Sequence, residues 1–237
     1  MSWLVIAVAA VLIAFALKGR KVGFIKTIFS IFSIIIAIVV SSVLSPYVSK
    51  ALRTNEKFYN YINERVEDVI NLKVEDKDKD KTTVSEQTEA INKLSLPESI
   101  KKNLLENKNN SEVYKALHVD TFKEYVSGYI TTIVINAIAF IITYLIVTIL
   151  LFAVCIALNI ISKLPIINGL NKTAGLLVGL FEGLLVIWML CIVLTAFSST
   201  ETAQKLFEMI KESQFLSCLY DNNLLIRFIT NMAKVLF

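Results

Sequence analysis

The chain has 237 residues, of which 55% are hydrophobic and 19% are charged, so it is more apolar than a soluble domain of this length usually is. Its net charge of +4 is too small to indicate nucleic-acid binding. Every acidic residue except Glu182 lies outside four apolar blocks. This distribution predicts an all-α membrane protein with four transmembrane helices.

The four apolar blocks cover residues 3–17, 22–43, 129–161 and 174–197. A spanning helix needs about 20 apolar residues, so the second and fourth blocks fit, the first is short and the third is too long. We expect the first block to sit in thinned bilayer or to run past Lys18 with its end snorkelling. The third block is expected to tilt, or to extend beyond the membrane as a helix.

Basic residues indicate the orientation. They follow the first apolar block instead of preceding it, so the block is expected to be a retained anchor and not a cleavable signal peptide. The two short connections carry basic residues and no acid, which places them in the cytoplasm by the positive-inside rule. The N-terminus, the long loop and the C-terminus are then extracytoplasmic. The residues used as topology signals are Lys18, Arg20, Lys21, Lys26, Lys163 and Lys172.

Residues 51–128 form the predicted extracytoplasmic helical module, inserted between transmembrane helices 2 and 3. Apolar residues at helical spacing from Phe58 to Ile70 predict its first helix, and Pro97 marks the start of a second. Residues 73–81 alternate in charge, which is typical of a flexible stretch. Thr121 and Glu124 have the spacing of a capping box, which predicts that one helix runs from here into the third apolar block.

Residues 198–237 form a predicted amphipathic tail. Two apolar stripes, around Phe207 and around Phe228, are too short and too polar on their opposite faces to span. Two positions are open: flat at the outer interface, or packed on the helices of the module. We favour packing on the module, since two amphipathic segments on one side of the membrane can cover each other's apolar faces. The expected divisions are therefore 1–50, 51–128, 129–197 and 198–237.

Glycines at a four-residue spacing mark the fourth apolar block. Small residues in this pattern let two helix backbones approach closely, so helix packing is the role expected of Gly175, Gly179 and Gly183. Gly19 and Gly23 repeat the spacing and are interpreted in the same way.

Glu182 is a carboxylate near the middle of the same block, ten residues after Lys172. An ionisable residue at this depth is costly and is often functional. Two interpretations stay open: a proton-linked or cation-binding carboxylate, or a hydrogen-bonding group that holds helices together.

The remaining polar residues of the third block, Asn136 and Asn159, are expected to form hydrogen bonds between helices. His118 is the only histidine, and no catalytic arrangement can be built around it. Cys155, Cys191 and Cys218 lack metal-site or CxxC spacing. The chain has no glycine-rich phosphate loop, so neither an enzyme nor a bound cofactor or metal is predicted.

Three stretches together resemble the CvpA family, named for colicin V production. They are KGRKVGFIKTIFSIFSIIIAIVV at residues 18–40, NGLNKTAGLLVGLFEG at 168–183 and IKESQFLSCLYDNN at 210–223. The first is similar to the family's GxxxGF segment, and the second to its asparagine, basic residue and glycine ladder. One position departs: family members usually carry Lys or Arg where this chain has Glu182.

The resemblance implies an integral protein of the cytoplasmic membrane that supports toxin production or secretion and envelope function, by interaction and not by catalysis. A small oligomeric transporter or channel that uses Glu182 is the first alternative, and a structural scaffold of the envelope is the second. The expected partners are the lipid bilayer, with a second copy of the chain or a membrane or secretion protein, and no nucleic acid.

Overall fold

The computed structural model describes residues 2–70, 84–94, 96–108, 110–117, 119–157 and 170–228. All the regular secondary structure of these residues is helical, as the sequence predicts. Four helices are long and apolar enough to cross a membrane. They are α1 (Trp3–Val22), α2 (Phe24–Thr54), α7 (Phe122–Ala157) and α8 (Leu170–Ala196).

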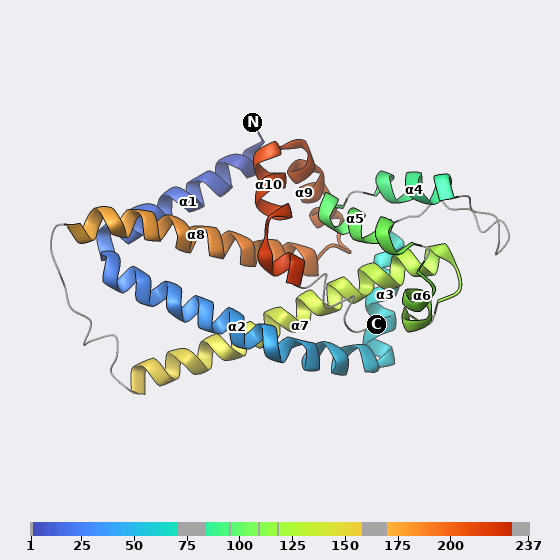
Figure 1. The fold of residues 1–237 in the computed structure, drawn as a ribbon, viewed down its shortest axis with the longest axis horizontal. Coiled ribbons are helices and arrows are strands. Elements are labelled where there is room, and N and C mark those ends of the chain that lie inside the picture. The colour runs from blue at the N-terminus through green and yellow to red at the C-terminus, as the bar shows by residue number, and fades with distance from the viewer. Residues whose placement is uncertain are drawn as a thin grey trace.

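The four long helices form one bundle (Figure 1). The apolar side chains that face out of it suit lipid contact, for example Phe32, Leu145 and Ile149, which are 60%, 55% and 66% exposed. Helix α1 continues past Lys18 to Val22, which gives it 20 residues, enough to cross a bilayer. The first apolar block is short, but the helix reaches a spanning length because its basic C-terminal turn extends it.

Helix α2 is longer than its apolar block. It has 31 residues and contains Pro46, so the expected division after residue 50 falls inside a helix. A proline removes one backbone hydrogen bond, but the helix continues to Thr54 because its polar last turns pack on α7. Ser41, Ser45 and Ser49 are fully buried there.

The capping box at the start of α7 is confirmed. Thr121 Oγ1 accepts from the backbone N–H of Glu124 at 3.2 Å, and Glu124 Oε2 accepts from the N–H of Thr121 at 3.0 Å. The helix then runs without a break for 36 residues. This continuity explains the excess length of the third block and joins the module rigidly to a long helix.

The module contains more helices than predicted. Beside α3 (Glu56–Ile70) and α5 (Glu98–Asn107), it has α4 (Val84–Lys93) and α6 (Ser111–Leu117). The buried amine of Lys101 holds α4 to α5, since its Nζ donates to Asn92 O at 2.9 Å and lies 3.6 Å from Glu98 Oε1. The predicted flexible stretch at 73–81 and His118 lie outside the described residues.

The tail consists of α9 (Glu201–Glu212), α10 (Gln214–Asp221) and a helical turn at 224–228. Phe207 and Tyr220 belong to the same buried core as Ile100 and Leu104 of α5. The Asp221 carboxylate also accepts from the N–H of Ser99 at 3.3 Å. Module, tail and one end of the bundle therefore share a single core.

Candidate functional site

The turn between α1 and α2 depends on Gly23. This residue has φ = 94°, in the region that glycine adopts without strain. Its N–H donates to Gly19 O at 2.8 Å, which closes the last turn of α1. The turn places the start of α2 beside α1 at the same end of the bundle as the start of α8 (Figure 1).

Helices α1 and α8 pack with their backbones in direct contact. A Cβ on Gly19 would overlap the carbonyl oxygen of Gly175 and lie 2.8 Å from Gly179 Cα. A Cβ on Gly179 would overlap the carbonyl oxygen of Phe15, and one on Gly183 would lie 3.0 Å from Phe15 Cβ. The glycines therefore lie at the point where only a hydrogen fits.

Glu182 lies beside this crossing and is 2% exposed. Its Oε1 is 2.9 Å from Lys18 Nζ and accepts a hydrogen bond of 2.8 Å from Ser30 Oγ. The carboxylate thus ties together α8, α1 and α2. Its Oε2 is buried and has no hydrogen-bond partner among the described residues.

The two members of the ion pair differ in exposure. The side chain of Lys18 is 52% exposed and that of Glu182 is 3% exposed. Lys18 Nζ also lies 5.0 Å from the centroid of the Phe15 ring. The cation therefore reaches from the surface into the bundle, and neutralises a carboxylate that would otherwise be buried alone.

The sequence does not reveal this partnership, because its pattern indicates only that Lys18 is a topology signal near the snorkelling end of the first block. The glycine pattern could have indicated it. When Gly19 packs on Gly175 and Gly179, Lys18 comes close to Glu182, which lies one turn further along α8. Ser30 carried no distinguishing pattern. Among the other basic residues, Arg20, Lys21 and Lys172 are exposed and Lys26 is partly buried, while Lys163 lies outside the described residues.

Asn136 is fully buried on α7 and accepts a hydrogen bond from Ser49 Oγ of α2. It lies toward the module end of the bundle, away from Glu182. Ser41 and Ser45 share this face of α2 at a four-residue spacing. Asn159 lies outside the described residues.

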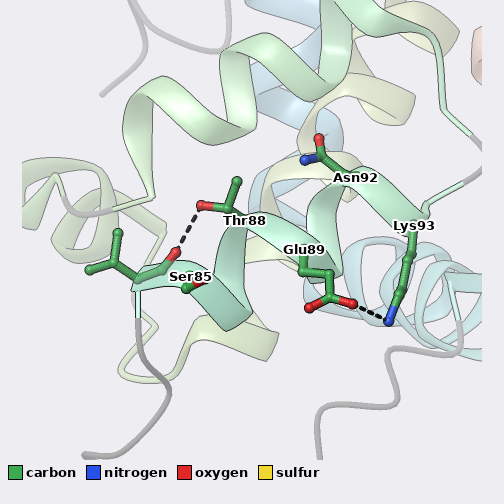
Figure 2. A pocket seen from close by; sticks show the side chains of 6 residues that line it. Ser85, Thr88, Glu89, Asn92 and Lys93 are labelled. Carbon is green, nitrogen blue, oxygen red and sulfur yellow. Dashed lines mark hydrogen bonds and ion pairs between the residues drawn. The ribbon is translucent and has the colours of Figure 1, made fainter.

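A hollow of about 630 Å³ lies along α4, and Figure 2 shows the side chains that line it. The described residues that line it all belong to this helix and include Thr88, Glu89 and Lys93. Glu89 and Lys93 form an ion pair of 2.7 Å, and Thr88 Oγ1 donates to Val84 O at 2.8 Å. These contacts are ordinary for an exposed helix, so the hollow is not assigned as a site.

The comparison with protein families gives one match, to the model described as Colicin V production protein, over residues 4–70 and 114–223. The matched ranges cover more than half of the chain and include Lys18, Ser30 and Glu182. They leave out residues 71–113, where α4 and α5 lie. No curated protein matches the chain, and no solved structure does.

Proposed function

Because the chain belongs to the colicin V production protein family, we propose that it supports production or secretion of a colicin V-type toxin and envelope function. It does so by contact with a partner protein, not by catalysis. The absence of a catalytic role is proposed because of the surroundings of Glu182. This carboxylate lies deep in α8, is neutralised by Lys18 and is held by Ser30.

The module and the tail are the parts proposed to meet the partner, on the outer side of the membrane. Both lie at the end of the bundle opposite the α1–α2 turn (Figure 1). Four spanning helices would return the chain to the side on which it began. The exposed basic residues Arg20, Lys21 and Lys172 gather at the other end, which supports a cytoplasmic position for that end.

Complementation tests this function. In a colicin V-producing strain that lacks its own family member, expression of this chain is expected to restore toxin in the culture medium, measured by killing of sensitive cells. The Gly179→Leu variant is the matched control, because a side chain there would force α1 and α8 apart. Normal amounts of the parent chain in the membrane without any return of toxin would contradict the proposal.

A small transporter or channel is the second candidate function. The observation that favours it is Glu182 Oε2, which is buried and without a hydrogen-bond partner among the described residues, so it could accept a proton or a cation. Transport predicts proton or cation flux into proteoliposomes that Glu182→Gln abolishes and Glu201→Gln, a change on the exposed start of α9, preserves. A parent protein that gives no more flux than empty liposomes excludes this candidate.

A further inference from the structure

A polar pocket of about 440 Å³ lies where the end of α2, the start of α3 and the start of α7 come together. Its size is in the range of small-molecule sites. Leu117, the last residue of α6, and Val119, which precedes α7, provide an apolar side. The polar side chains that line it are Arg53, Tyr59, Asn63, Glu67, Glu124, Ser127 and Thr132.

Arg53 supplies a positive charge to this pocket. Its Nε is buried and has no hydrogen-bond partner among the described residues. A buried donor without an acceptor is costly, so an acceptor that enters the pocket would stabilise it. Guanidinium groups bind phosphate through two parallel hydrogen bonds, which makes a phosphate the best match.

Glu67 supplies a negative charge, and its position is fixed by neighbouring side chains. Its Oε1 accepts from Asn63 Nδ2 at 2.6 Å and from Ser127 Oγ at 3.3 Å. Asn63 Oδ1 in turn accepts from Thr131 Oγ1 at 3.0 Å. Helix α7 therefore holds the carboxylate in place through Ser127 directly and through Asn63.

Arg53 and Glu67 line one pocket, yet no ion pair joins them in the described part of the chain. Tyr59 interacts with both: burial raises the pKa of its hydroxyl, the charge of Arg53 lowers it and the charge of Glu67 raises it. The pocket also contains the carboxylate of Glu124, whose Oε2 accepts from the N–H groups of Asp120 and Thr121 at the start of α7. Arg53 and Glu67, which share the pocket without pairing, match a ligand that carries both signs.

The position along α2 indicates the source of such a ligand. The apolar part of this helix ends near Tyr47, which is 74% exposed and has the character of an interfacial aromatic residue. Arg53 follows six residues later, which is about 9 Å along a helix. The pocket therefore lies on the side of Tyr47 where lipid headgroups are expected.

We propose that this pocket binds a phosphoethanolamine group, with its phosphate on Arg53 and its primary ammonium on Glu67. The ammonium N–H groups can donate to the Glu67 carboxylate. A choline group has no N–H to donate, and the glycerol headgroup of phosphatidylglycerol has no positive charge.

Binding can be measured by native mass spectrometry of the full-length protein released from mixed micelles. The lipids are phosphatidylethanolamine, phosphatidylglycerol and phosphatidylcholine with the same acyl chains. We expect phosphatidylethanolamine to be retained best. Arg53→Gln should weaken its binding about tenfold, the scale of one charge-assisted hydrogen bond, while Arg53→Lys should weaken it less. Glu67→Gln should remove the preference for phosphatidylethanolamine over phosphatidylglycerol.

The matched control is Arg65→Gln on α3, because Arg65 lies outside this pocket, 5.6 Å from the centroid of the Tyr61 ring. It should leave lipid binding unchanged. A variant is compared with the parent only if its thermal stability and its size-exclusion profile match those of the parent. Equal retention of the three lipids by the parent, or full retention by a folded Arg53→Gln variant, would overturn the proposal.

Competition with soluble phosphoethanolamine shows whether the bound group comes from a lipid headgroup or from a free small molecule. If it displaces the lipid at similar concentration, the pocket recognises the group in solution as well as in a bilayer. If only the lipid binds, the source is the membrane. Binding of neither compound overturns the proposal.

Discussion

Lys18→Met is expected to destabilise the bundle by about 3–5 kcal/mol, the cost of leaving a buried charge without its partner. Glu182→Gln should cost less, about 1–2 kcal/mol, although it breaks the same pair. The reason is the difference in exposure: Lys18 can turn to the surface, whereas the carboxylate of Glu182 stays buried. Unfolding in mixed micelles with rising SDS, followed by the fluorescence of Trp3 and Trp188, measures both values.

Lys21→Met is the control for charge loss in the same turn, because Lys21 is exposed and is expected to change stability little. Glu182→Lys would place two cations together and should be the most destabilising single change. Adding Lys18→Glu should recover much of that loss. Equal costs for Lys18→Met and Lys21→Met would contradict the role assigned to the pair.

Gly179→Ala is expected to destabilise the packing of α1 on α8 by up to about 3 kcal/mol, at the upper end of the cost of overpacking. The added methyl would meet the backbone of Phe15 and Gly19, and backbone cannot move aside as a flexible side chain can. The same SDS unfolding experiment measures the loss.

Gly128→Ala is the matched control, because it makes the same chemical change in another long helix. Its Cβ would lie 3.4 Å from the Tyr59 hydroxyl, and the three nearest atoms among the described residues all belong to side chains. Alanine is favoured over glycine in a helix by roughly 0.5–1 kcal/mol, so this variant should be as stable as the parent or more so. If Gly179→Ala behaves like Gly128→Ala, the close crossing is not as described.

The long helices and their start points could be predicted from the sequence, because hydropathy and capping act locally. The four spans and the box formed by Thr121 and Glu124 depend on residues close together in the chain. The end of α2 could not be predicted in this way. Pro46 and the serines after Val43 suggest an end, but burial of Ser49 against Asn136 of α7 keeps the helix intact to Thr54.

The short helices α4, α6 and α10 were missed for a related reason. Each has between seven and ten residues, which is too short for a strong periodic pattern and too short for independent stability. Their stability comes from the shared core, to which Ile91, Val113 and Tyr220 contribute. The partnership of Lys18 with Glu182 is equally non-local, since 164 positions separate the two residues.

The central claim is that the module and the tail lie together on the outer side, with the basic turn of α1 in the cytoplasm. Labelling of single cysteines by a membrane-impermeant maleimide tests it most directly, in a chain whose other cysteines are replaced by alanine. With the cytoplasmic membrane intact, Tyr61→Cys and the native Cys218, both at exposed positions, are expected to react. Lys21→Cys should react only after the membrane is permeabilised. Labelling of Lys21→Cys across an intact membrane, or protection of either Tyr61→Cys or Cys218, would contradict the account.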